Sequence, residues 1–400
     1  MTADGASTRA VVARRSLLLG AAGIAGAGST GVLSRAAAHD PMAGSNTGRL
    51  NEPLWRQAAN GVVYGSSVAS WQLEPEYRDL VAREAAVLFT EDDLLWYRLK
   101  QTPRSKLDFR FADRVIEFAE RNRQLVFGAH LVWDNGFGDG WTTNDMRDLQ
   151  EREARTLLFG TVRDVVRRYR GRIAAWVVAN QVSDPGGRDG LRTDSAWHQA
   201  LGPGYVAESF HIASQHDPQA DLVLNESELE TASSSGDPAA RRRATLQVLD
   251  SLLDQGVPVN SLGIQAHLRA QDFADRFSSR SYRSFLQDVA DRGLHVHITE
   301  LDVLDDGLAA DHRARDRAVA DVYRRYLDVT LDVAAVKTVV TFGLSDRFSW
   351  LQEDYPRHDG AGRRPLPFDR ALRPKPAYYA LSSALRQAPH RRPAWAHPRR

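Results

Sequence analysis

Residues 294–302, LHVHITELD, form the stretch that decides the fold, because a β-branched strand pattern there runs directly into two carboxylates. Successive side chains of a strand point to opposite faces, so Val296, Ile298, Glu300 and Asp302 are predicted to share one face. The face begins with apolar residues, so we interpret it as the inner side of the sheet. Glu300 and Asp302 are therefore expected at the buried end of a strand.

Seven further runs have strand character, and they are residues 62–68, 87–90, 125–133, 173–180, 222–226, 262–267 and 336–343. Amphipathic stretches separate them, such as residues 108–121, where apolar residues recur at helical spacing. Eight strand–helix units in about 330 residues favour an α/β protein with a single closed (β/α)8 TIM barrel. No glycine-rich phosphate loop follows the first strand, which speaks against a dinucleotide-binding fold.

Polar residues end five of the predicted strands, and they are Asp134, Asn180, Gln181, Asn225, Glu226, Gln265, His267, Glu300 and Asp302. In a barrel of this kind the active site lies at the carboxyl ends of the strands. These side chains are therefore predicted to meet in one site. His267, one strand away, is the natural partner of Glu300.

Several segments carry a family resemblance, and they are 128–133 (GAHLVW), 176–181 (WVVANQ), 263–268 (GIQAHL), 298–302 (ITELD), 342–346 (FGLSD) with 349–350 (SW), and 375–379 (KPAYY). In order and spacing they resemble the successive signatures of glycoside hydrolase family 10, the endo-xylanase family. The resemblance covers residues 55–385 and implies the same barrel.

The resemblance also implies roles for individual residues. In retaining glycosidases one carboxylate attacks the anomeric carbon and a second protonates the leaving oxygen. Glu300 matches the nucleophile, His267 and Asp302 match the residues that hold it, and Gln181 occupies the position of the acid/base carboxylate. The expected substrate contacts come from Glu91, Trp133, Asp134, Asn180, Asn225, Gln265, Phe342 and Trp350. No cofactor and no metal are expected.

The substitution at Gln181 removes a proton donor, because a carboxamide neither gives nor takes a proton near neutral pH. Other departures from the family pattern replace side chains that bind sugar hydroxyls in the family. Leu95 stands at the sugar-binding lysine, Ala129 and Asp134 at two histidines, Phe342 at a tryptophan and Ser227 at a tyrosine.

Three functions remain open from the sequence. The first is a divergent enzyme that uses Glu300 on a glycoside or an exported small molecule and is poor on plain xylan, with Asp134, Glu226 and Asp184 as candidate replacement acids. The second is a weakly active endo-1,4-beta-xylanase whose acid comes from elsewhere. The third is a non-catalytic barrel that binds a glycan or a protein.

The amino-acid composition limits which classes of binding partner are expected. Lys and Arg number 52 and Asp and Glu 51, a balance that gives no reason to expect nucleic acid or a membrane surface as ligand. The absence of cysteine excludes disulfides and thiolate chemistry. We expect a monomer that binds a carbohydrate or another neutral small molecule.

The two ends of the chain differ from the barrel. Arg14-Arg15, a short apolar run and Ala36-Ala37-Ala38 follow the order of a twin-arginine export signal over residues 1–38. Residues 39–54 are predicted to be a linker. Residues 386–400, rich in proline and arginine, are predicted to be a disordered tail.

The signal predicts that the mature protein begins near His39 and is found outside the cytoplasm, with no membrane attachment after export. N-terminal sequencing of secreted protein should therefore start close to His39. Intact residues 1–38 on protein recovered from the cell interior would contradict this expectation.

Overall fold

The computed structural model describes residues 52–58, 60–141, 146, 148–231 and 237–395. The predicted export signal, most of the predicted linker and residues 396–400 lie outside the described residues.

Parallel strands form a closed barrel, as predicted. The strands are β1 (Val63–Val68), β2 (Val87–Thr90), β3 (Leu125–Gly128), β4 (Ala175–Asn180), β5 (Asp221–Glu226), β6 (Ser261–Ile264), β7 (His267–Arg269), β8 (His295–Leu304) and β9 (Val336–Thr341). Neighbours in the chain pair with one another from β1 to β6, β6 pairs with β8, and β9 pairs with both β8 and β1. β7 is a short extra strand that pairs only with β8 at its carboxyl end. The other eight strands close the (β/α)8 barrel.

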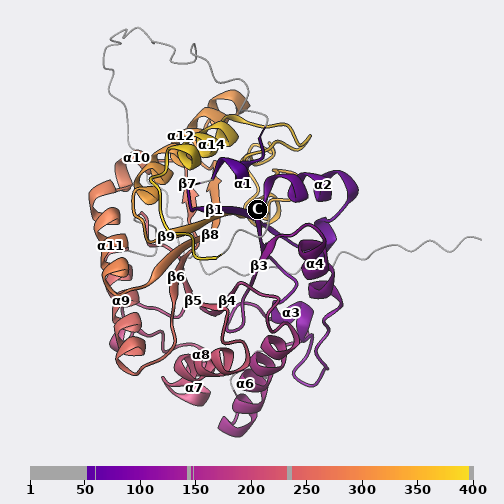
Figure 1. The fold of residues 1–400 in the computed structure, drawn as a ribbon, viewed down its shortest axis with the longest axis vertical. Coiled ribbons are helices and arrows are strands. Elements are labelled where there is room, and N and C mark those ends of the chain that lie inside the picture. Colours follow the sequence, from indigo (N-terminus) through magenta and orange to yellow (C-terminus); the bar gives the residue numbers. More distant parts are fainter. Residues whose placement is uncertain (1–51, 59, 142–145, 147, 232–236, 396–400) are drawn as a thin grey trace, which may run out of the picture.

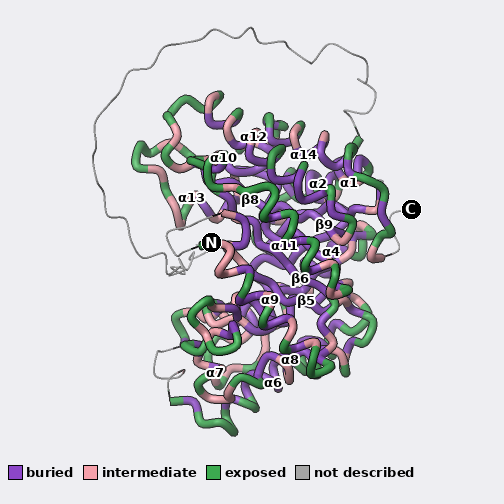
Figure 2. The backbone as a smooth tube through the Cα atoms, turned by 90° about the vertical axis from the view of Figure 1, so that its left-hand side faces the viewer, coloured by how far each residue is buried: buried purple, intermediate pink, exposed green. Residues whose placement is uncertain are grey.

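Helices surround the barrel (Figure 1). They are α1 (Leu54–Gln57), α2 (Pro75–Glu84), α3 (Trp96–Leu99), α4 (Arg110–Arg121), α6 (Glu151–Arg168), α7 (Ala196–Leu201), α8 (Tyr205–His216), α9 (Pro238–Asp254), α10 (Phe273–Arg276), α11 (Ser279–Asp291), α12 (His312–Leu331), α13 (Leu351–Asp354) and α14 (Pro376–Gln387), with 3-10 turns at Ser70–Gln72 and Arg188–Gly190. Figure 2 shows the strands buried and the outer helix surfaces exposed. The amphipathic stretch predicted at 108–121 is α4, whose apolar residues face the sheet.

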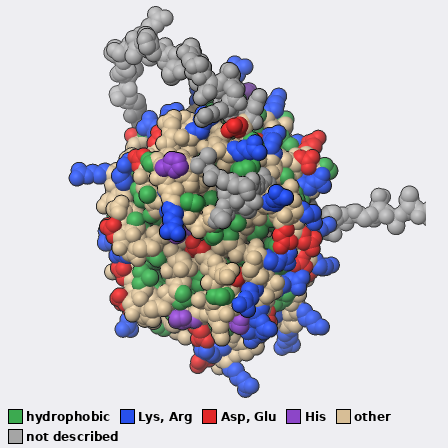
Figure 3. Space-filling view, in the orientation of Figure 1, with side chains coloured by type: hydrophobic (Ala, Val, Ile, Leu, Met, Phe, Trp, Pro, Cys, Tyr) green, Lys and Arg blue, Asp and Glu red, His purple; other side chains and the backbone are tan. Residues whose placement is uncertain are grey.

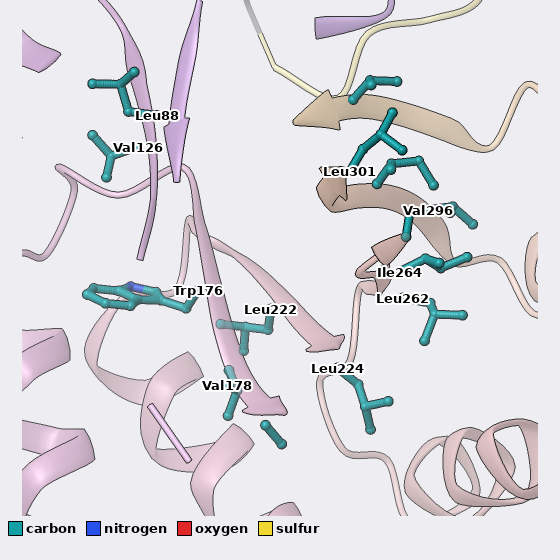
Figure 4. Close-up of a cluster of buried hydrophobic side chains, with 14 of the residues drawn as sticks. Leu88, Val126, Trp176, Val178, Leu222, Leu224, Leu262, Ile264, Val296 and Leu301 are labelled. Atoms are coloured by element: carbon teal, nitrogen blue, oxygen red, sulfur yellow. The ribbon is translucent and has the colours of Figure 1, made fainter. Parts of the chain in front are cut away.

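The barrel has two apolar layers. The inner layer contains side chains such as Val63, Phe89, Phe127, Val177 and Val340, and the outer layer lies between strands and helices. Figure 4 shows part of the outer layer, with side chains from several neighbouring strands.

The outer layer contains Val296 and Ile298, so our prediction that they face the barrel interior is wrong. His297 faces inward instead, and its ring lies 5.3 Å from that of Phe127. The physical reason is an irregularity in β8: Ile298 pairs with Val339 and Leu301 with Thr341, which leaves one extra residue on β8. A bulge of this kind resets the alternation of side chains. Glu300 therefore reaches the site although Ile298 points outward.

Some strand boundaries also differ from the prediction. β3 ends at Gly128, and of the expected continuation to residue 133 only Val132 makes a bridge, to Ala179. The predicted strand at 262–267 divides into β6 and β7, because Ala266 between them has a left-handed φ of 61°. That break turns His267 toward β8, where it pairs with Asp302.

The tail was expected to be disordered from residue 386, and its described part is packed instead. α14 continues to Gln387, and the buried Arg391 side chain donates hydrogen bonds to the carbonyls of Val333 and Val336, both at 2.9 Å, and to that of Leu331. Trp395 stacks on His297 with ring centroids 5.3 Å apart. The tail up to residue 395 therefore covers the amino-terminal opening of the barrel.

Charges are dispersed on the visible surface. On the face in Figure 3, Lys and Arg side chains are interspersed with Asp and Glu around the outline of the molecule. Within the described part of the chain, no helix is both long and apolar enough to span a bilayer.

Replacing Arg391 with Ala should lower the free energy of unfolding by about 2 kcal/mol or more, because buried carbonyls lose their donor. Urea unfolding followed by circular dichroism measures the change. Arg392→Ala is the matched control, since the Arg392 side chain is exposed and only its backbone oxygen is used, by Lys337. Equal midpoints for the two variants would contradict a packed tail.

Candidate active site

Glu300 is the centre of the polar cluster at the carboxyl end of the barrel. Its Oε1 accepts a hydrogen bond of 2.8 Å from Asn225 Nδ2, and its Oε2 lies 3.2 Å from His267 Nε2. The other ring nitrogen of His267 lies 2.9 Å from Asp302 Oδ1, and Trp350 Nε1 donates to Asp302 Oδ2 at 2.7 Å. The predicted trio of Glu300, His267 and Asp302 is therefore one connected chain of hydrogen bonds.

This chain fixes the charge of its members. Glu300 is only 4% exposed, and burial alone would raise its pKa. The hydrogen bond from His267 and the charge of the nearby His130 outweigh burial and hold the pKa of Glu300 below its ordinary value. Burial likewise opposes a charge on His267, but Asp302 and Glu300 raise the pKa of His267 to about 10. At neutral pH the pair is a carboxylate beside an imidazolium.

Asn225 positions Glu300 from the opposite side. Its amide nitrogen also donates to Asn180 Oδ1 at 2.9 Å, and its oxygen accepts from Thr299 Oγ1 at 2.8 Å. The close packing requires glycine at position 263, because a Cβ atom there would lie 2.2 Å from Asn225 Oδ1. Strands β4, β5, β6 and β8 thus hold the amide in a single orientation.

Gln181 lies beside this network in a strained backbone conformation. Its φ of 56° is left-handed, which costs a residue with a side chain about 1 kcal/mol or more. Its Oε1 accepts from Trp133 Nε1 at 2.9 Å, while its Nε2 donates to Gln265 Oε1 and Ser227 Oγ, both at 3.3 Å. Gln265 in turn donates to Asn180 at 3.1 Å. The amide is therefore tied into the chain that ends at Glu300.

Aromatic rings border the cluster. The His267 ring lies 5.3 Å from that of Phe342 and 5.2 Å from that of Trp350. Trp133 lies on the side of Gln181, with its ring 5.3 Å from that of His130. A buried carboxylate flanked by aromatic rings and amides is typical of a site that binds a small molecule.

A sequence profile of glycosyl hydrolase family 10 matches residues 55–384, most of the chain. The chain belongs to glycosyl hydrolase family 10. Endo-1,4-beta-xylanase B of Thermotoga neapolitana is 28% identical over 329 residues, which are 82% of this chain and 88% of that protein. Endo-1,4-beta-xylanase 5 of Pyricularia oryzae is 29% identical over 316 residues, which are 78% of this chain and 72% of that protein.

Solved structures of the family agree with this. Xylanase 10B of Thermotoga maritima superposes with a TM-score of 0.73 at 27% identity, over 83% of this chain and 98% of that one. Xylanase 10B of Thermotoga petrophila RKU-1, solved in complex with xylobiose, has the same TM-score and identity and covers 84% and 97%.

Two further predicted site residues of this family-10 chain are Glu91 and Asp134. Glu91 is buried against β1, where Ser67 Oγ donates to it at 2.7 Å and Gln72 Nε2 at 3.1 Å. Asp134 lines a small cavity, too narrow for a water molecule, together with Trp133, Asn180 and Gln181. Burial raises its pKa despite hydrogen bonding to Ser195.

Of the three candidate replacement acids, only Asp134 lines that cavity. Glu226 is fully enclosed and accepts from the Ser183 backbone amide at 2.7 Å, and burial raises its pKa to about 7. Asp184 accepts from the Gly186 amide at 3.2 Å within a turn. Of the three, Asp134 is therefore the one that lies beside Gln181.

Sequence reasoning missed two neighbours of the site. His130 Nε2 lies 3.8 Å from Glu300 Oε1, and Thr299 orients Asn225. The available signal for His130 was its place within the quoted segment 128–133, one position after the family's histidine. Among the described residues no cluster of His, Asp and Glu side chains is suited to hold a metal ion.

The raised pKa predicts a pH effect on stability. Because the folded-state pKa of His267 lies above its ordinary value of 6.5, protonation of its ring stabilises the fold below about pH 6.5, and this contribution disappears as pH rises through about 10. Asp302→Asn should lower the pKa of His267 and reduce this loss.

Titration of His267 by ¹⁵N nuclear magnetic resonance measures the shift directly. We expect an imidazolium at pH 8 in the wild type and a substantially lower pKa in Asp302→Asn. A wild-type pKa near 6.5 would contradict the charged pair.

Proposed function

We propose that the protein is a retaining glycosidase for β-1,4-linked xylose chains, with Glu300 as nucleophile and little activity on unactivated glycosides. The observation that carries the proposal is the buried Glu300 carboxylate, whose pKa is held low by His267 and whose second oxygen is fixed by Asn225. Relatives of this chain named as xylanases support xylose as the sugar.

The first half-reaction follows from this geometry. A Glu300 oxygen would form a bond to the anomeric carbon as the bond to the leaving oxygen breaks, giving a glycosyl ester and an alkoxide or phenolate. The departing oxygen needs a proton when its conjugate acid is weak. Gln181, at the acid position, cannot give one, so only an activated leaving group departs readily.

The second half-reaction also requires a proton transfer that Gln181 cannot perform. Water must lose a proton as its oxygen bonds to the anomeric carbon and the ester bond to Glu300 breaks. Gln181 cannot accept that proton, and Asp134, which lies beside Gln181, is the candidate acceptor. Hydrolysis of the glycosyl ester is therefore expected to be slow.

Aromatic side chains at the catalytic end support a glycan ligand. Trp71, in the turn after β1, is 49% exposed, one of two large apolar side chains among the described residues with such exposure. Asp92 fixes its ring, because Trp71 Nε1 donates to Asp92 Oδ2 at 2.9 Å. A ring held in solvent in one orientation can stack on the apolar face of a sugar.

A second function, glycan binding without turnover, is favoured by one observation. Both ends of the Gln181 amide have partners in the site, namely Trp133, Gln265 and Ser227. Satisfied amide networks give rigid, specific binding surfaces. Leu95, which is buried, stands at the position of the family's sugar-binding lysine. In either function we therefore expect a lower affinity for the sugar.

We also propose that this activity takes place outside the cytoplasm, in a monomer. The order of charged, apolar and small residues over 1–38 supports the location outside the cytoplasm.

Gln181→Glu should raise hydrolysis of xylohexaose at least about 10-fold, because it restores a carboxyl group of nearly the same shape opposite Glu300. The gain should fall short of the roughly 10²–10⁴-fold typical of general acid catalysis, since Leu95 and Ala129 leave the sugar poorly aligned. Dinitrophenyl xylobioside should gain less in kcat/KM, because its leaving group needs no proton, whereas its kcat should rise because the restored carboxylate speeds hydrolysis of the glycosyl ester. Initial rates on both substrates measure this.

Glu300→Gln and the double variant serve as controls and should be inactive on both substrates. Unchanged rates in every variant, with circular dichroism confirming the fold, would favour the binding function over catalysis.

A further inference from the structure

A cavity of about 710 Å³ lies away from Glu300, between the first turns of α12 and the segment 362–376. None of the residues that hold Glu300 lines it. We propose that this cavity binds an oxyanion with three or more negative charges, carried by phosphate or sugar carboxylate groups.

The charge of the cavity wall supports an anion. Eight of the lining side chains are Lys or Arg, and two are Asp. Five of the eight cations have a carboxylate within 3.3 Å; for example, Arg364 pairs with Asp316 at 2.6 Å and Lys375 with Asp346 at 2.9 Å. Asp369, the second lining carboxylate, is used by Arg373. The acidic residues of the wall are therefore already neutralised.

Three guanidinium groups are left over. Arg313, Arg317 and Arg370 are exposed and have no acidic partner among the residues that the structure describes. Arg313 and Arg317 are four residues apart on α12 and so share one face of the helix, and Arg370 comes from the facing segment. Unpaired charges from two elements thus meet at one cavity.

The excess of positive charge at this cavity is local, since the whole chain carries a formal net charge of only +1. Like charges around one cavity repel one another, and a bound anion removes that repulsion. Guanidinium groups bind phosphate and carboxylate oxygens through paired, parallel hydrogen bonds. Carboxylates hold the five paired cations of the wall, and the three unpaired guanidinium groups line the same cavity, where they can bind one ligand.

Isothermal titration of the full chain at 150 mM NaCl tests the proposal with two probes, tripolyphosphate and trigalacturonate. We expect saturable binding of at least one probe at a single site; the probe that binds identifies phosphate or carboxylate as the recognised group. The variant with Arg313→Gln, Arg317→Gln and Arg370→Gln should bind at least about 100-fold more weakly, since three charge-assisted contacts are lost.

The matched control carries Arg104→Gln, Arg114→Gln and Arg243→Gln. These arginines are also exposed, have no acidic partner among the described residues, and lie outside the cavity wall. The control removes the same charge and should retain wild-type affinity. Equal weakening in both triple variants, or no binding of either probe by the wild type, would overturn the proposal. The outcome does not depend on glycosidase activity.

Discussion

The ionised carboxylate of Glu300, buried in the barrel, is the constraint on which the rest of the site depends. A buried carboxylate without partners costs several kcal/mol, so each of its oxygens must be matched. His267 and Asn225 supply the match, His267 needs Asp302 to remain charged, and Asp302 is fixed by Trp350. These residues come from β5, β7, β8 and the segment after β9. The closed barrel, with β7 at the carboxyl end of β8, brings them together.

Under the proposed function, the same network would let the protein keep a nucleophile without an acid. Gln181 stays in its strained conformation and retains hydrogen bonds to Trp133 and Gln265. On this proposal the shape of the site is preserved, whereas proton transfer is lost. Binding and nucleophilic attack would then be separated from leaving-group protonation, and the chemistry would become sensitive to the leaving group.

The barrel and the His267–Glu300 pair could be predicted because short stretches of the sequence, namely the strand patterns and the motifs, indicate both. The inward face of β8 could not, since the bulge after Ile298 reverses an alternation that the sequence shows as regular. The packing of the tail could not be predicted from the sequence either. Arg391 and Trp395 look like surface residues until their partners, some 55 to 98 positions earlier in the chain, are known. Contacts of that range follow from the fold and not from the local pattern.

Mass spectrometry after incubation with dinitrophenyl 2-deoxy-2-fluoro-xylobioside tests most directly whether Glu300 is a competent nucleophile without an acid. The leaving group needs no proton, and Gln181 cannot activate water for release. We predict one added fluoro-xylobiosyl group, stable over hours and mapped to the peptide that contains Glu300. Unmodified Glu300 in folded protein, or a label on another residue, would contradict the account.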